Sequence, residues 1–326
     1  MGLKPARASL VSVVNLGTLG GAVSQAKAVN RSGQVVGTGQ DASGRTRAFL
    51  WRENQGMVDV RPMTGMNASA NDISEQGEIV GGGDTGFGEF HAYFLSDGTS
   101  FDLGTLGGPE SEALAVNRQG QVAGHSRVAG HPAKRAFFIP EPAHMIDLGS
   151  PGGGMSIAHD VNDRGDVVGF AQSPSGASHA FLWTGGGQGM LDLGSFRGNP
   201  TIALAINNRR EVVGGSGRAF RWTADEGMTD LGTLGGGASS CANDINDQGL
   251  IVGVSQTGAT GARGTPVTHA FLLAPDGTML DLGTLGGEHS SAAAVSEEDG
   301  GLVRVAGHSH DAGGRIRATL WIVRLA

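Results

Sequence analysis

The heptamer Asp102–Gly108, DLGTLGG, recurs along the chain and decides its fold. Close copies occupy Asn15–Gly21, Asp230–Gly236 and Asp281–Gly287, and degenerate copies begin at Asp59, Asp147 and Asp192. We number the repeats 1 to 7 by these starts, which lie near residues 15, 59, 102, 147, 192, 230 and 281. Self-similarity at about 40–50 residues is typical of four-stranded propeller blades.

Each repeat carries four short strand signals separated by turn residues. In repeat 1 the first is a small-residue alternation that ends at Asn30, the second is Val35–Gly37 and the third is Ala48–Trp51. The fourth is clearest in repeat 4, at Met190–Leu193. Alternation with a period of two predicts strands rather than helices.

The first two strands of most repeats are separated by the pattern Asn-x-x-Gly, as at Asn30–Gly33 and Asn162–Gly165. The Asn side chain is expected to cap the turn, and the Gly to supply a positive φ. Repeat 5 departs from this pattern with Arg210 at the Gly position, and repeat 7 inserts Glu297–Gly301.

The strand count predicts that the chain closes into a ring. Repeat 7 ends after Leu320-Trp321 without a fourth strand, whereas a spare fourth-strand sequence, Leu10–Leu16, precedes repeat 1. Pairing this strand with repeat 7 would remove exposed sheet edges. We therefore expect an all-β, seven-bladed β-propeller with four antiparallel strands per blade, formed as one domain over residues 1–326, in which the N-terminal strand closes blade 7.

Composition and charge exclude several classes of protein. Glycine provides 58 of the 326 residues without a collagen period, which indicates many tight turns. The net charge of −8 argues against nucleic acid or an anionic membrane as partner, and no run of about 18 apolar residues could span a bilayer. The N-terminus lacks the apolar segment of a signal peptide, so we expect a cytoplasmic monomer, or a secreted protein if a signal peptide was removed.

Two tripeptides, His179-Ala180-Phe181 and His269-Ala270-Phe271, together with the DLGTLGG copies, give the chain a resemblance to the HAF-repeat family. The resemblance extends from about residue 10 to residue 326. It implies an extracellular repeat protein with no general enzymatic assignment. The chain departs from the family pattern where arginine replaces the histidine, at Arg47, Arg135, Arg218 and Arg317.

This His or Arg occurs once in every repeat, whereas a catalytic residue would be special to one repeat. We interpret it as a donor to a backbone carbonyl or to the Asp of the DLG segment, beside a buried Phe. The GTLGG segments lack the helix and the lysine of a phosphate-binding loop, so they are predicted to be crossovers between blades.

Topology places these crossovers and the second-to-third-strand loops at one end of the propeller, the loop end. The Asn-x-x-Gly turns lie at the other end, the hairpin end. The loops vary: repeat 5 has only Gly215–Gly217, and repeat 6 has about Ser255–Thr268. Variable loops on a rigid scaffold usually carry specificity, so a ligand is expected in the axial mouth at the loop end.

Titratable residues that break the repeat at the loop end are the candidate site residues. Glu112, His125 and His159, in repeats 3 and 4, are the candidate catalytic residues, because a His beside a carboxylate can act as general acid or base. Glu110 is a candidate ligand-binding residue. The alternative is that these are ordinary solvated loop residues.

Repeat 7 gathers a second group of such residues. His289, His308 and His310 are candidate ligand-binding residues, with Glu288 and Asp311 nearby. His308 and His310 alternate on one strand and share a face, so a divalent metal is possible there. No other cofactor is predicted, and solvated loop residues are again the alternative.

Cys241 is the one cysteine of the sequence and is predicted to be buried and unreactive. Two functions remain. The first is a binding scaffold that presents variable loops around an axial pocket to a small molecule or a protein partner. The second is a lyase, cyclase or hydrolase of a small organic substrate, with acid–base His and Glu residues at the axial mouth. The repetitive sequence favours binding, and the uneven placement of His and acidic residues favours an enzyme.

Overall fold

The computed structural model describes residues 8–140, 144–185 and 189–325, and this part of the chain is built from β-strands. The one helical segment among these residues is a single 3-10 turn, η1 (Leu234–Gly236). No helix in the described ranges is long and apolar enough to cross a membrane. The all-β class is therefore confirmed, and residues 1–7, 141–143, 186–188 and 326 of the predicted domain lie outside the described residues.

Each repeat forms strands of three to ten residues. Repeats 1 and 2 form β2 (Gly20–Val29), β3 (Val35–Asp41), β4 (Thr46–Arg52), β5 (Gly56–Asp59), β6 (Ala68–Ile73), β7 (Ile79–Asp84), β8 (Phe90–Ser96) and β9 (Thr99–Gly104). Repeats 3 and 4 form β10 (Gly107–Val116), β11 (Val122–Val128), β12 (Lys134–Ile139), β13 (Ile146–Gly149), β14 (Ser156–Val161), β15 (Val167–Gln172), β16 (Ser178–Trp183) and β17 (Met190–Gly194). Repeats 5 and 6 form β18 (Ile202–Ile206), β19 (Val212–Gly215), β20 (Ala219–Thr223), β21 (Gly227–Asp230), β22 (Ser240–Ile245), β23 (Ile251–Thr260), β24 (Pro266–Leu273) and β25 (Met279–Asp281). Repeat 7 forms β26 (Gly286–Val295), β27 (Leu302–Asp311) and β28 (Ile316–Arg324), and β1 (Ser9–Asn15) precedes repeat 1.

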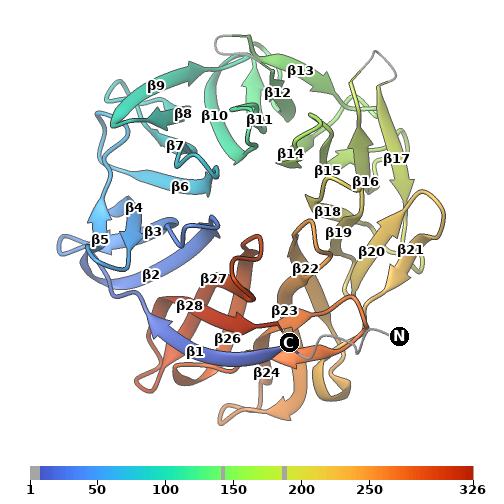
Figure 1. Cartoon of the computed structure of the whole chain (residues 1–326). Helices are drawn as coiled ribbons and strands as arrows, with labels where there is room; N and C mark the ends of the chain where they lie inside the picture. Colours follow the sequence, from blue (N-terminus) through green and yellow to red (C-terminus); the bar gives the residue numbers. More distant parts are fainter. Residues whose placement is uncertain (1–7, 141–143, 186–188, 326) are drawn as a thin grey trace.

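The strands of each repeat pair in antiparallel order, and the sheets surround a central opening (Figure 1). First strands such as β2, β6 and β10 lie next to the opening, and fourth strands such as β5, β9 and β13 lie at the periphery. Repeats 1, 4, 5 and 6 each form a separate four-stranded sheet. Repeats 2 and 3 share an eight-stranded sheet, because Glu110 of β10 forms one parallel pair with Phe90 of β8. The fold is therefore propeller-like.

The N-terminal strand pairs with the last strand of the chain, as the strand count predicted. β1 runs antiparallel to β28, from Ser9 opposite Arg324 to Asn15 opposite Thr319 (Figure 1). Leu16 follows β1, is 5% exposed and donates its N–H to the Ala318 carbonyl at 2.9 Å. The two ends of the chain are thus held together in one sheet, in the order β1-β28-β27-β26.

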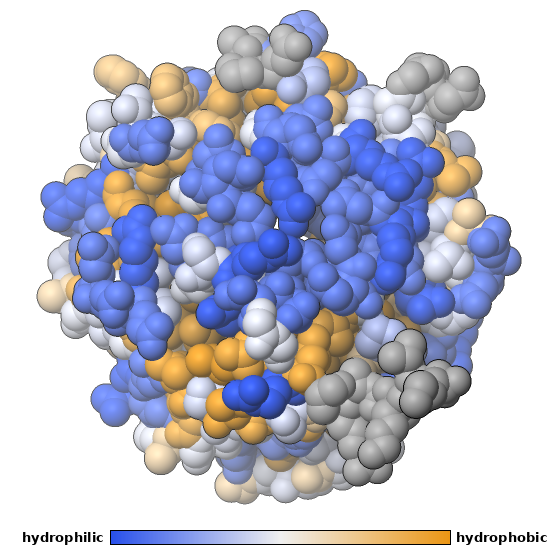
Figure 2. Space-filling view, viewed as in Figure 1, coloured by the Kyte–Doolittle hydropathy of each residue, from blue (hydrophilic) through white to orange (hydrophobic). Residues whose placement is uncertain are grey.

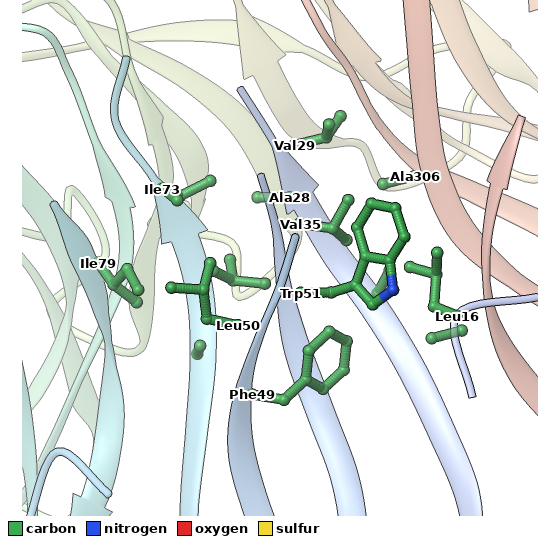
Figure 3. Close-up of a cluster of buried hydrophobic side chains, with 14 of the residues drawn as sticks. Leu16, Ala28, Val29, Val35, Phe49, Leu50, Trp51, Ile73, Ile79 and Ala306 are labelled. Carbon is green, nitrogen blue, oxygen red and sulfur yellow. The ribbon is translucent and has the colours of Figure 1, made fainter. Parts of the chain in front are cut away.

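The core lies between neighbouring sheets. In the cluster of Figure 3, Phe49 and Trp51 of β4 pack with Val35 of β3 and with Ile73 and Ile79 of the next sheet. Burial of a large apolar side chain stabilises the fold by about 1.5–3 kcal/mol. The third strands supply the largest buried side chains, all at most 2% exposed: Phe49, Tyr93, Phe137, Phe181, Phe220, Phe271 and Trp321.

In six of the seven repeats a hydroxyl in or next to the first strand links the repeat to the preceding one. Ser111 Oγ accepts the Ala92 N–H at 2.8 Å and donates to the Gly104 carbonyl. Repeat 2 has Ala68 at this position. The same link is made by Ser24, Ser156, Thr201, Ser240 and Ser290.

The hairpin Asn residues cap their own turns, as predicted, and also join neighbouring sheets. Asn162 Oδ1 accepts the N–H groups of Arg164 and Asp166 at 3.0 Å each, and Gly165 has φ 75°. Asn162 Nδ2 also donates to the Asn207 carbonyl of the next sheet at 3.1 Å. Equivalent links start from Asn30, Asn117, Asn207 and Asn246.

Arg210 takes the left-handed conformation that glycine adopts in the other turns, with φ 62°. Its guanidinium forms two bonds with the carboxylate of Asp166 in the preceding sheet, at 2.7 and 3.0 Å. The Asp166 side chain is 1% exposed and that of Arg210 is 46% exposed. This ion pair is the structural reason that arginine occupies a glycine position.

The predicted loop Ser255–Thr268 is largely strand. β23 continues to Thr260 and β24 begins at Pro266, so a long hairpin with a five-residue tip replaces the expected loop. The register shifts between Gln256 and Thr260. The strands extend because Thr and Val residues favour the pleated conformation.

Candidate functional site

The crossovers and the second-to-third-strand connections meet at one end of the molecule, as predicted. The Leu residues of three GTLGG segments form parallel bridges beside these connections: Leu19 with Asp41, Leu106 with Val128 and Leu285 with Asp311. In repeat 6 the segment forms the turn η1 instead. The loop end therefore combines both kinds of variable segment.

The hairpin end has a shallow axial depression of about 160 Å³, lined by residues from every repeat. Figure 2 shows hydrophilic residues around a narrow central opening on the face that it displays, in keeping with this polar lining. Its side chains bond to one another: Asp163 and Asp247 both accept from Asn208 Nδ2, at 2.9 and 2.8 Å. Glu297 accepts the Asp247 N–H at 3.0 Å. These contacts hold neighbouring sheets together, which gives the depression a structural role.

A larger cavity of about 580 Å³ opens at the loop end between repeats 5 and 6. Its walls come from the first strands β18 and β22, from residues 215–217 and from β23 and β24. The apolar part of the lining is Pro200, Ile202, Leu204, Cys241 and Val254. The short connection after β19 and the long hairpin of β23 and β24 shape this cavity, and both differ from the other repeats.

Gly215 lies where the two walls meet. It pairs with Ile202 in the β18–β19 hairpin. A Cβ added at Gly215 would lie 2.7 Å from Cys241 Sγ, which is closer than real atoms approach. A side chain at this position would therefore require the Cys241 thiol to move.

Cys241 was predicted to be buried, and the structure places it only partly buried in the cavity wall. Burial raises the pKa of its thiol to about 11. A thiol is nucleophilic as the thiolate, so Cys241 is a neutral group near pH 7. The prediction of a small, unreactive side chain is in keeping with this chemistry, and the predicted full burial is corrected to partial burial in the cavity wall.

The first strands β2, β6 and β10 lie on the other side of the central opening from β18 and β22 (Figure 1), and they carry a polar cluster. Lys27 Nζ donates to Asn71 Oδ1 at 2.6 Å, and Asn71 Nδ2 donates to Glu112 Oε1 at 2.9 Å. Ser69 Oγ donates to the same carboxylate oxygen at 3.1 Å. Burial lowers the pKa of Lys27, although the charge of Glu112 opposes this effect. Glu112 of β10 is thus held by two side chains of β6, and Lys27 of β2 reaches it through Asn71.

The structure brings His125 next to Glu112, its direct neighbour on the paired strand. The His125 Nε2 and Glu112 Oε2 atoms are 3.7 Å apart. His125 is 5% exposed, and its Nδ1 has no hydrogen-bond partner among the described residues. Burial lowers the pKa of His125, and the charge of Lys134 adds to this effect while Glu112 opposes it.

His159 lies in β14 and links its sheet to the next one. Its Nδ1 is 2.8 Å from the Ala203 carbonyl oxygen, so this nitrogen carries the proton. Its ring packs against Phe170, with centroids 5.8 Å apart. Burial lowers the pKa of His159, and the nearby His125 adds to the effect. The neutral ring holds repeats 4 and 5 together at the axis.

In repeat 7 the candidate residues form pairs. The rings of His289 and His310 meet edge to face with centroids 5.1 Å apart, and Thr268 Oγ1 lies 3.1 Å from His289 Nδ1. Burial lowers the pKa of His308, and the charge of His310 adds to the effect. Within the described ranges, no three His, Cys, Asp or Glu side chains are close enough to hold a metal ion. The side chains predicted for a metal in repeat 7 thus do not form a cluster of three in this structure, and Asp311 is paired with Arg317 at 3.2 Å.

Glu110 is engaged by cations of its own repeat. Its carboxylate pairs with Arg127 Nε at 3.0 Å and with Lys134 Nζ. Its backbone forms the single parallel pair with Phe90. These contacts occupy the carboxylate that was predicted to bind a ligand.

The repeated His or Arg is a structural donor, as predicted. His179 Nδ1 is 2.9 Å from the Asp192 carboxylate, and Arg135 donates to the Gly153 carbonyl at 3.0 Å. Asp192 Oδ1 also accepts the Gly194 N–H, which fixes the end of the DLG segment. The same Asp pairing is made by His91, His269 and Arg218.

No protein-family model and no curated protein matches this sequence. The fold is similar to that of an acylaminoacyl peptidase from Pyrococcus horikoshii, with a TM-score of 0.52 and 11% identity over 92% of this chain and 51% of that one. The chain thus spans about half of the peptidase. Two further structures cover nearly all of both chains at 12% identity: a protein of unknown function from Dyadobacter fermentans, with 98% and 99% covered and a TM-score of 0.48, and a gluconolactonase from Xanthomonas campestris, with 99% and 96% covered and a TM-score of 0.43. At these identities the similarity concerns the fold alone.

None of the residues predicted for the site lines the loop-end cavity. Sequence reasoning searched for titratable side chains and missed Ile202 and Leu204. Counted back from the hairpin Asn of each repeat, Ile202 is equivalent to Glu112 of repeat 3, and Leu204 is equivalent to Lys27 of repeat 1. Repeat 5 has an apolar residue at both of these positions, whereas every other repeat has a polar residue at one or both, and this difference was the signal that could have revealed the cavity.

Proposed function

We propose that the chain is a seven-bladed β-propeller of the HAF-repeat type that binds a small molecule at its loop end. The blade count is supported by the pairing of four strands in each repeat. The eight-stranded sheet is interpreted as two blades, since one residue pair, Glu110 with Phe90, connects them. β1 then supplies the fourth strand of the seventh blade.

The cavity of about 580 Å³ between repeats 5 and 6 carries the proposal. Small-molecule sites are typically concave, mostly apolar and roughly 300–1,000 Å³ in volume. The first strands β18 and β22 hold Ile202 and Cys241 on rigid sheets, and the long hairpin of β23 and β24 adds Gln256 and Thr268 at the wall. Rigid walls favour binding, because little conformational entropy is lost when the ligand enters.

Binding is favoured over catalysis because the described lining contains one titratable side chain, Cys241. Its thiol pKa is raised to about 11, so it supplies neither a thiolate nor a proton shuttle near neutral pH. The remaining polar groups of the lining are hydroxyls and amides, which orient a ligand without reacting with it.

A screen of small organic molecules by thermal unfolding tests this proposal. The wild-type chain is compared with Ile202→Trp, which fills the cavity, and with Leu191→Trp as matched control. Both side chains are exposed residues of strands, at 37% and 55%. We expect compounds that raise the melting temperature of the wild type and of Leu191→Trp but not of Ile202→Trp. Equal shifts in all three proteins would contradict binding in this cavity.

A second candidate function is acid–base catalysis at the axis, favoured by the distance of 3.7 Å between Glu112 and His125. A carboxylate beside a neutral imidazole can accept and return a proton. For any compound from the screen that the chain converts, Glu112→Gln should abolish turnover and leave binding in the cavity unchanged. Full turnover in this variant would exclude the function.

A further inference from the structure

The loop-end cavity is electrically neutral. Among the described residues that line it, none carries a formal charge. Arg218, which follows the lining residue Gly217, is paired with Asp230 at 3.3 Å, and Arg197 is paired with the same carboxylate at 2.7 Å. Two guanidiniums thus share one carboxylate beside the cavity, and all three charged side chains lie outside its lining.

The polar side chains of the lining are hydroxyls and amides, and all of them are uncharged. Gln256 Oε1 accepts the Ala238 N–H at 3.1 Å, which leaves the amide nitrogen of Gln256 as a donor. Thr268 Oγ1 is 3.1 Å from His289 Nδ1, and Ser239 adds another hydroxyl. Groups of this kind bind a carbonyl, ether or hydroxyl oxygen of a ligand, and they offer no counter-charge to an ion.

We infer that the ligand is an uncharged, mainly apolar molecule with one or two neutral oxygen or nitrogen groups. This inference rests on the proposed function. The side chains of Ile202, Leu204 and Val254 cover its apolar body, and Gln256 bonds its polar group. A charged ligand would lose part of its hydration here without gaining an ion pair, and such a loss is unfavourable.

A matched pair of fluorescent probes separates these possibilities. N-phenyl-1-naphthylamine is uncharged, and 8-anilinonaphthalene-1-sulfonate has the same aromatic rings with an added sulfonate. Both are titrated against the wild type, Ile202→Trp and Leu191→Trp. Occupancy is also followed by the rate at which N-ethylmaleimide alkylates Cys241, the one cysteine of the chain. A bound probe covers the thiol that lines the cavity.

We expect the uncharged probe to bind the wild type and Leu191→Trp at least about tenfold more tightly than the sulfonate, a difference of about 1.4 kcal/mol. It should also slow the alkylation of Cys241, and Ile202→Trp should abolish both effects. Equal or tighter binding of the sulfonate, lost in Ile202→Trp, would overturn the ligand class and leave the proposed function standing. If neither probe binds or protects Cys241, or if Ile202→Trp changes nothing, the inference and the proposed function both fail.

Discussion

Replacing Arg210 by glycine restores the turn residue of the other repeats, yet we expect it to destabilise the fold. Two effects oppose each other. Arg210 has φ 62°, and a non-glycine residue in this region destabilises the folded chain by about 1–2 kcal/mol. Glycine removes this strain, but it also has more conformational freedom in the unfolded chain, and this freedom cancels part of the gain. The relief of strain is therefore worth at most about 1 kcal/mol.

The loss of the ion pair is larger. Asp166 is 1% exposed and accepts two bonds from the Arg210 guanidinium. Removing one partner of a buried pair costs about 3–5 kcal/mol. Arg210 is 46% exposed and Asn162 Nδ2 stays bonded to Asp166 at 3.1 Å, so we reduce the cost to about 2–3 kcal/mol. Arg210→Gly should then lower the free energy of unfolding by about 1–3 kcal/mol.

Urea unfolding of four proteins checks this estimate. Arg210→Ala loses the ion pair and keeps the strained φ, so it should be about 1 kcal/mol less stable than Arg210→Gly. Adding Asp166→Asn to Arg210→Gly removes the unpaired charge and should restore most of the loss. If Arg210→Gly is as stable as the wild type or more stable, backbone strain outweighs the ion pair and this reasoning is refuted.

Three further predictions concern ring closure, the hairpins and the axis. Deletion of residues 1–16 removes β1 and should lower the melting temperature or cause oligomerisation, because the outer edge of β28 is left unpaired; a monomeric truncated chain with an unchanged melting temperature would contradict ring closure. Asn162→Ala should cost about 1–3 kcal/mol in urea unfolding, since it removes the turn cap and the bond to the Asn207 carbonyl, and probe binding at the loop end should stay unchanged; lost binding in the folded variant would place the site at the wrong end. Burial raises the pKa of Asp160 to about 6, so the folded chain holds this proton more tightly than the unfolded chain, and stability should fall as pH rises from about 4 to about 6. In Asp160→Asn the free energy of unfolding should change by about 1–3 kcal/mol less over this pH range than in the wild type. If the free energy of unfolding of both proteins changes equally with pH, the Asp160 carboxyl does not cause the pH dependence.

The local structure could be predicted from the sequence, because it depends on residues close together in the chain. The alternation in Ala48–Trp51 is sufficient to predict a strand with Phe49 in the core. The cap of Asn162 on its own turn needs only the next four residues. The pairing of β1 with β28 is a long-range contact, but counting strands predicted it. Repeat 7 lacks a fourth strand and one spare strand precedes repeat 1, so the two can be paired in one way.

Contacts between sheets needed the tertiary structure. Asn162 Nδ2 faces the carbonyl of Asn207, and His159 Nδ1 faces that of Ala203. The partners are more than forty residues apart in both cases, and no local pattern shows which carbonyl an amide or imidazole will meet. For this reason His159, a candidate catalytic residue by sequence, was not foreseen as a link between sheets.

The candidate site also needed the tertiary structure. Its cavity is the volume left where Gly215 lacks a side chain and where β18 meets β22, so it depends on how two sheets pack rather than on a motif. The sequence alone determined the repeats, the strands and the loop end at which the cavity lies. Only the packing decided that Ile202 and Cys241 line it while Glu112 and His125 lie elsewhere, because side chains from separate repeats become neighbours only when the ring is formed.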